Sequence, residues 1–139
     1  DCESLEEITI PKSVSIIGER AFANCPIKNI VIPEKVDTIG EAAFSCLPIS
    51  KIELPKNLKF LGGSAFDGCD NLKEIYCPCE LIENLSEFMS NMHDGVNHVI
   101  DLYVPNNLYD AYLEIEMEHQ MEHQGLPFPQ RFNIHKYDF

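Results

Sequence analysis

The chain of 139 residues lacks long apolar runs and has few basic side chains. No stretch approaches the roughly 20 consecutive apolar residues that a membrane-spanning helix needs. Its 23 acidic side chains outnumber the 10 basic ones, which gives a formal net charge of −13. Nucleic acids and anionic membrane surfaces are recognised largely through Lys and Arg, so this balance argues against both as partners. The hydrophobic content of 45% is ample for the core of one domain.

Several motifs that carry chemistry are also missing. The sequence contains no G-x-S-x-G, no glycine-rich phosphate loop and no D-x-D-x-D-G calcium loop. Residues 1–4 have neither a basic segment nor an apolar run, so no signal peptide is visible, as in a processed exported chain. We expect a non-enzymatic domain without a cofactor.

A 22-residue repeat dominates the first half of the chain. Prolines recur at 11, 33 and 55, glycines at 18, 40 and 62, and phenylalanines at 22, 44 and 66. Three segments align with the pattern L-x-x-I-x-I-P-x-x-V-x-x-I-G-x-x-A-F-x-x-C, and a fourth begins at Leu72 and departs from it after Pro78. A fixed period of this kind indicates structural units that stack on one another.

Each part of the repeat has a physical reading. Ile8 and Ile10 alternate around Thr9, which is typical of a short strand, and Pro11 ends the strand because it has no N–H to donate. We expect the glycines at 18, 40 and 62 to mark a bend or a place where two backbone segments approach closely. The opposite wall of the coil is expected to contain Val14, Ile17, Ala21 and Phe22. One repeat cannot bury these side chains alone, whereas stacked repeats form a continuous core.

The pattern resembles the BspA-like leucine-rich-repeat family over residues 5–78. The proline after the strand and the Gly-x-x-Ala-Phe block carry the resemblance, whereas classical leucine-rich repeats have Asn after the strand. The resemblance implies a leucine-rich-repeat solenoid, a right-handed β/α superhelix of short parallel strands. It also implies an exported or cell-surface protein that acts in adhesion and protein binding. We divide the chain into repeats at 1–79 and a C-terminal capping region at 80–139.

The capping region is predicted to begin with a helix and a strand. Residues 80–91 predict a helix with Leu81, Ile82, Leu85, Phe88 and Met89 on one face. The sequence His93-Asp94-Gly95 predicts a turn. Residues 99–104 predict a strand, and because Leu102-Tyr103-Val104-Pro105 repeats the pattern Ile75-Tyr76-Cys77-Pro78, we place it next in the same sheet.

A second helix and a last strand complete the prediction. Asn106 or Asn107 would be the N-cap of a helix that runs to about Gln124 and stops at Gly125. Its apolar face would contain Leu108, Ala111, Tyr112 and Ile115. Residues 132–135 predict a short final strand. This region is similar to the C-terminal ends of BspA-like proteins, which implies a helical cap over the open end of the stack.

The N-terminal end repeats the spacing of a later segment. Cys2-Glu3-Ser4-Leu5 matches Cys69-Asp70-Asn71-Leu72. This spacing makes Cys2 the tail of a preceding repeat. Two interpretations follow: the chain is a fragment of a longer protein, or its N-terminal end self-associates with another copy.

The cysteines allow two interpretations. Cys2, Cys25, Cys46 and Cys69 recur at one place in the repeat and would stack roughly 5 Å apart, at the strand spacing. We favour a ladder of buried reduced thiols over disulfides, because a buried thiol is a small apolar filler. Cys77 and Cys79 are one residue too close for a redox C-x-x-C motif, and no second Cys pair completes a zinc site.

The sequence His119-Gln120-Met121-Glu122-His123 fits the inverted zinc-protease pattern H-x-x-E-H. Histidines four apart share a helix face, but a catalytic site needs a third protein ligand. The 16 residues after His123 contain no Glu and one Asp, Asp138. A local duplication of Met-Glu-His-Gln also generates the motif. We therefore expect no metal site: His119 and His123 are candidates for adventitious metal binding, and a solvated acidic helix is the preferred interpretation.

The predicted binding surface is the outward, concave face of the sheet. Its residues are Glu7, Thr9, Asn29, Val31, Lys51, Glu53, Glu74, Tyr76 and Tyr103. Tyr76 and Tyr103 would be its aromatic anchors, because Tyr is enriched in binding hot spots. The expected partner is a protein ligand, such as one from a host or extracellular matrix. The alternatives are a solvated mixed-charge face on a purely structural repeat segment and, least favoured, a zinc hydrolase.

Overall fold

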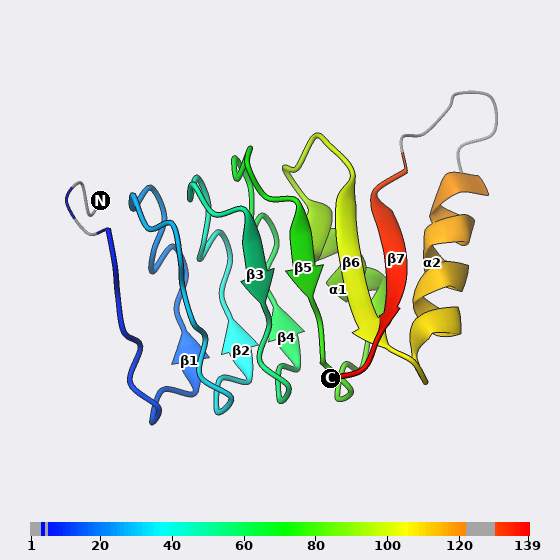
Figure 1. The fold of residues 1–139 in the computed structure, drawn as a ribbon, viewed down its shortest axis with the longest axis horizontal. Helices are drawn as coiled ribbons and strands as arrows, with labels where there is room; N and C mark the ends of the chain where they lie inside the picture. Colours follow the sequence, from blue (N-terminus) through cyan, green and yellow to red (C-terminus); the bar gives the residue numbers. More distant parts are fainter. Residues whose placement is uncertain (1–3, 5, 122–129) are drawn as a thin grey trace.

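Two parallel sheets enclose one hydrophobic core in the computed structural model, which describes residues 4, 6–121 and 130–139 (Figure 1). One sheet has the order β1-β2-β4, with β1 at Ile16–Ile17, β2 at Thr38–Ile39 and β4 at Phe60–Leu61. The other has the order β3-β5-β6-β7, with β3 at Lys51–Glu53, β5 at Glu74–Tyr76, β6 at Ile100–Pro105 and β7 at Phe132–Tyr137. The helices are α1 at Leu85–His93 and α2 at Tyr109–Met121.

Successive turns of the chain stack directly on one another. The rings of Phe22, Phe44 and Phe66 are nearly parallel, with centroids 5.8 and 5.9 Å apart. Backbone hydrogen bonds join the same turns: the Gly62 N–H donates to the Ile39 carbonyl at 2.8 Å. Parallel strands in stacked turns, together with two helices, fit the leucine-rich-repeat type of fold that the sequence predicts.

The wall opposite the longer strands differs from the expected β/α alternation. In the described part of residues 4–79, this wall consists of two-residue strands and turns, and it contains no helix. Positive φ recurs there at two positions of the repeat. One position is occupied by Arg20, Ala42 and Ser64, and the other by Asn24, Cys46 and Gly68. A residue in the left-handed region interrupts a right-handed helix, which explains why only turns form in these repeats.

The predicted ladder of buried cysteines is wrong at Cys46, which is exposed. The 22-residue period places Leu47, not Cys46, between the buried Cys25 and Cys69. Cys46 instead occupies the positive-φ position of the repeat that Gly68 occupies in the next turn. The second repeat has its cysteine one residue closer to the phenylalanine, and this shift moves the thiol out of the core. Cys2 lies outside the described residues.

Helix α1 replaces the next short strand beside β4. It begins at Leu85, because the Asn84 side chain caps it by accepting a hydrogen bond from the Glu87 N–H at 3.1 Å. The predicted helix started at residue 80, but Leu81 lies outside α1 and is exposed. On the core side, Asn91 Nδ2 donates to the Leu61 carbonyl at 2.8 Å, so α1 satisfies a carbonyl of β4 that a further strand would otherwise bond.

Strand β6 pairs with β5, as predicted from the repeated strand-and-proline pattern. Helix α2 follows it but begins at Tyr109, so the predicted N-cap at Asn106 or Asn107 is wrong. The Asn106 side chain instead donates a hydrogen bond to Asp138. Ala111, predicted on the apolar face, is exposed, and the predicted end of this helix at Gln124 and Gly125 lies outside the described residues.

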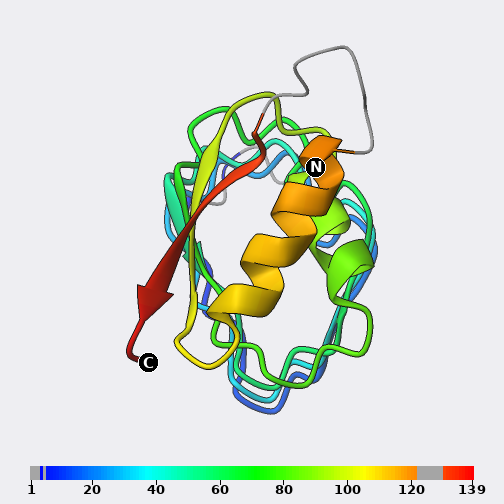
Figure 2. The same ribbon diagram turned by 90° about the vertical axis from the view of Figure 1, so that its right-hand side faces the viewer.

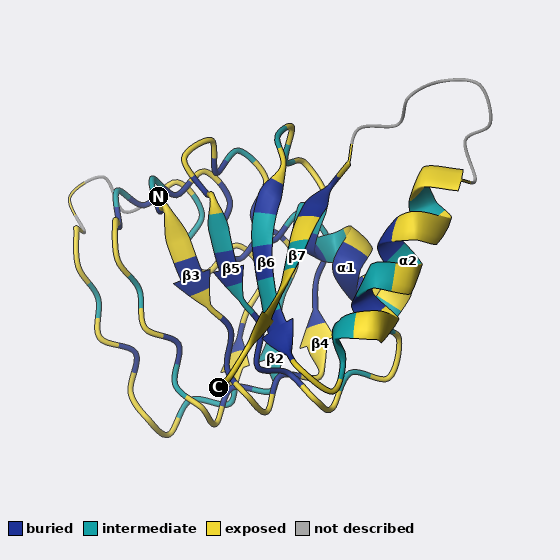
Figure 3. Ribbon diagram, turned by 45° about the vertical axis from the view of Figure 1, so that its right-hand side comes forward, coloured by how far each residue is buried: buried dark blue, intermediate teal, exposed yellow. Residues whose placement is uncertain are grey.

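Helix α2 lies across the C-terminal end of the stack, and the chain then returns as β7 (Figure 2). β7 pairs in parallel with β6 over its whole length and runs two residues beyond the predicted 132–135. Its inward Phe132 is buried, whereas most of its other residues are exposed (Figure 3). The crossover β6-α2-β7 therefore adds one strand to the sheet and covers its last turn.

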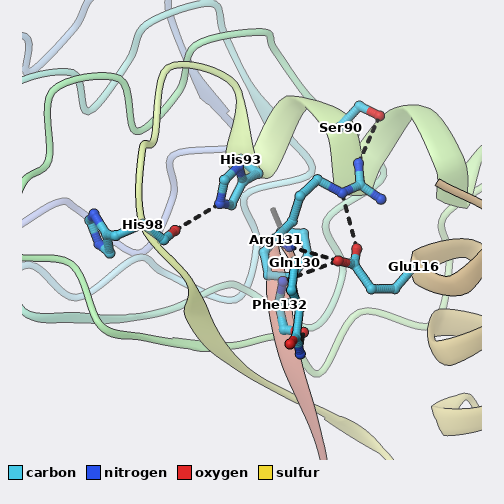
Figure 4. A network of polar contacts seen from close by, with 7 residues as sticks. All are labelled: Ser90, His93, His98, Glu116, Gln130, Arg131 and Phe132. Carbon is cyan, nitrogen blue, oxygen red and sulfur yellow. Dashed lines mark hydrogen bonds and ion pairs between the residues drawn. The ribbon is translucent and has the colours of Figure 1, made fainter. Parts of the chain in front are cut away.

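A buried ion pair fastens β7 to α2 (Figure 4). Glu116 of α2 accepts hydrogen bonds from Arg131 Nε at 3.0 Å, from the Arg131 N–H at 2.7 Å and from the Phe132 N–H at 3.3 Å. The guanidinium also donates to Ser90 Oγ of α1 at 3.3 Å. The Glu116 carboxylate thus accepts hydrogen bonds from two backbone N–H groups at the start of β7, and Arg131 links α1 and α2.

Candidate binding surface

The outward side chains of the longer sheet lie in two rows that cross its strands. Ile52, Ile75 and Leu102 point into the core, so their neighbours point outward. Paired residues across the strands are Lys51, Glu74, Asp101 and Asn133 in the first row, and Glu53, Tyr76, Tyr103 and His135 in the second. We call the outward face with these two rows the binding face.

The second row contains a stack of rings. Tyr76 and Tyr103 lie face to face with centroids 4.5 Å apart and an interplanar angle of 7°. His135 continues the stack at 4.9 Å from Tyr103, because each ring stands on the next strand of the sheet. Tyr137 meets Tyr76 and Tyr103 edge-on at 5.3 and 5.8 Å. The stack ends at Tyr76, since the next position in the row is Glu53.

Carboxylates hold both ends of this arrangement. Asp101 Oδ1 lies 2.9 Å from His135 Nε2 and accepts from Asn133 Nδ2 at 3.2 Å. The hydrogen bond from His135 lowers the pKa of Asp101 below its usual range. The Tyr76 hydroxyl donates to Glu74 Oε2 at 3.3 Å, and loss of solvation together with the Glu74 charge raises the pKa of Tyr76. The rings are therefore fixed by polar contacts as well as by stacking.

An open groove of about 1110 Å³ runs beside the stack. It is lined by Glu53 of β3, by Tyr76 of β5, and by Tyr137, the last residue of β7, together with Asp138 and Phe139. Its remaining lining includes Val31 and Lys51. The groove is therefore bounded by stacked aromatic rings and by charged side chains.

The sequence model of the BspA type leucine-rich repeat region matches residues 1–112 in six copies. The chain belongs to the BspA-type leucine-rich-repeat family. The predicted resemblance is thereby confirmed. Repeats of this family are found in protein-interaction modules and generally in non-enzymatic proteins. No curated protein and no solved structure matches the chain.

The BspA-type repeats place the predicted binding residues on the side that carries the binding face. Glu7 and Asn29 form an isolated parallel bridge, which continues the first row toward the N-terminal end. Tyr76 and Tyr103 are brought into direct contact, and Val31 is 81% exposed. Every predicted position is exposed or half-buried: Glu7, Thr9, Asn29, Val31, Lys51, Glu53, Glu74, Tyr76 and Tyr103. Asn29, Val31, Lys51, Glu53 and Tyr76 line the groove.

Four residues of the binding face were missed by sequence reasoning: Asp101, Asn133, His135 and Tyr137. A signal for two of them was present. In the sequence Phe132-Asn133-Ile134-His135, apolar residues alternate with polar ones, which is the pattern of a half-buried strand.

His119 of the H-x-x-E-H pattern is half-buried on α2, beside a small hollow that His93 and Arg131 also line. Glu122 and His123 lie outside the described residues. Within residues 4, 6–121 and 130–139, no three His, Cys, Asp or Glu side chains are grouped so that they could hold a metal ion. Neither α1 nor α2, nor any other helical segment in these ranges, is long and apolar enough to cross a membrane.

Proposed function

We propose that this BspA-type chain is a protein-binding module that engages its partner through the binding face. The observation that supports this most is the stack of Tyr76, Tyr103 and His135 at the edge of an open groove. Aromatic side chains are enriched at the centres of protein interfaces, where they provide contact area at a small cost in side-chain entropy. Because these rings already hold one another in place, little of that entropy is left to lose on binding.

The wider context follows from the family. We place the repeats in a right-handed leucine-rich-repeat solenoid that α2 and β7 cap at the C-terminal end, with the binding face on its concave side. BspA-type proteins are often surface-associated, which supports an exported or surface-attached chain that acts in adhesion. An extracellular matrix protein is the partner to test first.

The test is capture of matrix proteins by the immobilised chain and by variants of the binding face. We expect Tyr76→Ala and Glu53→Lys each to lose most of a specifically bound partner, since both residues line the groove. Two matched controls lie on the opposite wall, where Phe60 is 51% exposed and Glu41 is exposed. Phe60→Ala also removes an aromatic ring and Glu41→Lys makes the same charge reversal there, and both should leave binding intact.

A purely structural segment of a longer surface protein is the second candidate. The observation that favours it is the C-terminal closure, in which α2 and β7 cover the last turn and are fastened by the pair of Glu116 and Arg131. In that case the capture experiment would return no protein whose retention differs between the binding-face variants and the control variants. Equal retention would therefore replace the binding proposal with the structural one.

A further inference from the structure

One ring face at the end of the aromatic stack borders the groove. Tyr103 covers the other face of Tyr76 at 4.5 Å, and Tyr137 meets Tyr76 edge-on. On the open side, the paired position on β3 is Glu53, which carries no ring. Both Glu53 and Tyr76 line the groove, so a planar group that entered there would lie between the ring and the carboxylate.

The Glu53 carboxylate has no charged partner within the part of the chain that the structure describes. Neither it nor the nearby Lys51 forms an ion pair or a side-chain hydrogen bond there. A second carboxylate, that of Glu74, accepts a hydrogen bond from the Tyr76 hydroxyl at 3.3 Å. The ring is thus bordered by negative charge on its open side and at its polar end.

The groove has more acidic than basic side chains. Its charged residues are Glu34, Glu53, Glu80 and Asp138 on one hand and Lys51 and Lys56 on the other. The whole chain has a formal net charge of −13, which adds a long-range attraction for cations. Charge complementarity therefore favours a basic occupant.

We propose that this groove binds an arginine-containing basic segment of a protein partner, with the guanidinium stacked on Tyr76 and paired with Glu53. This inference rests on the proposed function and names the chemistry of its partner. A guanidinium is flat enough to continue the stack of rings, and its N–H fork matches a carboxylate. Lysine offers only a compact point charge, so the geometry selects arginine.

Two other occupants fit less well. A neutral sugar chain would gain nothing from the excess of acidic side chains that line the groove. Small-molecule sites are typically concave pockets of about 300–1,000 Å³ that bury most of the ligand. This groove, at about 1110 Å³, is open, which suits several residues of an extended chain.

The test measures fluorescence anisotropy of labelled hexa-arginine and hexa-lysine peptides with the full chain, at about 0.15 M ionic strength so that long-range attraction is screened. We expect hexa-arginine to bind more tightly than hexa-lysine. Glu53→Gln and Tyr76→Leu should each weaken hexa-arginine about tenfold, whereas Tyr76→Phe, which keeps the ring, should retain most of the affinity. The control Glu41→Gln removes the same charge from the opposite wall and should leave binding unchanged.

Glu53 is exposed, so Glu53→Gln leaves the core intact and keeps the test valid even if Tyr76→Leu folds poorly. Equal affinity for both peptides, or an equal loss in Glu41→Gln, would mean general attraction to an acidic chain and would overturn the arginine assignment. Absence of binding, or displacement of hexa-arginine by a neutral oligosaccharide, would overturn it as well. None of these results affects the proposed function. That proposal fails only if captured partners are retained equally by the unmodified chain and by Tyr76→Ala and Glu53→Lys.

Discussion

Replacement of glycine by alanine at one repeat position is expected to have opposite effects in different turns. A Cβ atom on Gly62 would lie 2.4 Å from the Glu41 backbone nitrogen and 2.6 Å from the Gly40 carbonyl carbon. A Cβ atom on Gly40 meets the preceding turn in the same way, at 2.6 Å from the Glu19 nitrogen. On Gly18 it would find no described atom within 4 Å. Glycine is therefore required where a turn stacks against it, not for its backbone dihedrals.

The magnitude follows from the contact. Relief of the clash in Gly62→Ala to an ordinary 3.4 Å requires the turns to separate locally by the difference from 2.4 Å, which is 1.0 Å. Overpacking of this kind costs about 1–3 kcal/mol, and loss of the hydrogen bond from Gly62 to Ile39 adds about 1 kcal/mol. Gly18→Ala meets no clash and should stabilise the chain by about 0.4–1 kcal/mol, because it restricts the unfolded state. The two variants should differ by about 2.4–5 kcal/mol.

The assay is urea denaturation followed by circular dichroism, with the transition midpoint and slope fitted for both variants. We expect Gly62→Ala to unfold at clearly lower urea than the unmodified chain, and Gly18→Ala at the same or higher urea. Gly40→Ala should behave like Gly62→Ala, since its Cβ atom meets the equivalent backbone atoms of the preceding turn. Equal midpoints for Gly18→Ala and Gly62→Ala would refute the explanation by backbone contact.

Three further predictions concern the Glu116–Arg131 pair, two cysteines and His93. Arg131→Met leaves Glu116 buried without its counter-charge and should lower the free energy of unfolding by about 3–5 kcal/mol in urea denaturation, and a matching loss should follow from Glu116→Leu. Cys46 should react with a thiol reagent in the folded chain, whereas Cys69, whose pKa burial raises to about 11, should react only after unfolding; similar rates would contradict the corrected repeat register. Burial lowers the pKa of His93, so the unfolded chain binds its proton first: stability should fall as the pH drops through about 6.5 and level off once the folded chain is protonated too, with a smaller slope in His93→Gln.

The stacked turns could be predicted from the sequence because their signal is repeated. Proline, glycine and phenylalanine each recur at a fixed spacing, and each has a local physical reason to do so. The same repetition misled at Cys46, because the residue type was matched instead of the spacing. Backbone geometry decides that position: the chain has positive φ at Cys46 and at Gly68, and the side chain that follows enters the core.

The C-terminal region could not be predicted as fully, because its structure depends on contacts between distant residues. Glu116 lies among other acidic residues on α2, and nothing near it in the sequence marks it for burial. Arg131, 15 residues later, provides the partner that makes its burial tolerable. Tyr76 and Tyr103 could be placed from the strand pattern, whereas the position of His135 depends on the register of β7 against β6.

The C-terminal cap, formed by α2 and β7, also holds part of the binding face in place. His135 and Tyr137, which extend and border the aromatic stack, stand on β7, and β7 is the last strand of its sheet in the described part of the chain, where it pairs with β6. An edge strand with one neighbour is held less firmly than a central strand, so its position needs further support. The Glu116 carboxylate supplies it, since it accepts both backbone N–H groups at the start of β7. The buried Glu116 carboxylate therefore also fixes the geometry of a surface, because it holds the strand on which His135 and Tyr137 of the binding face stand.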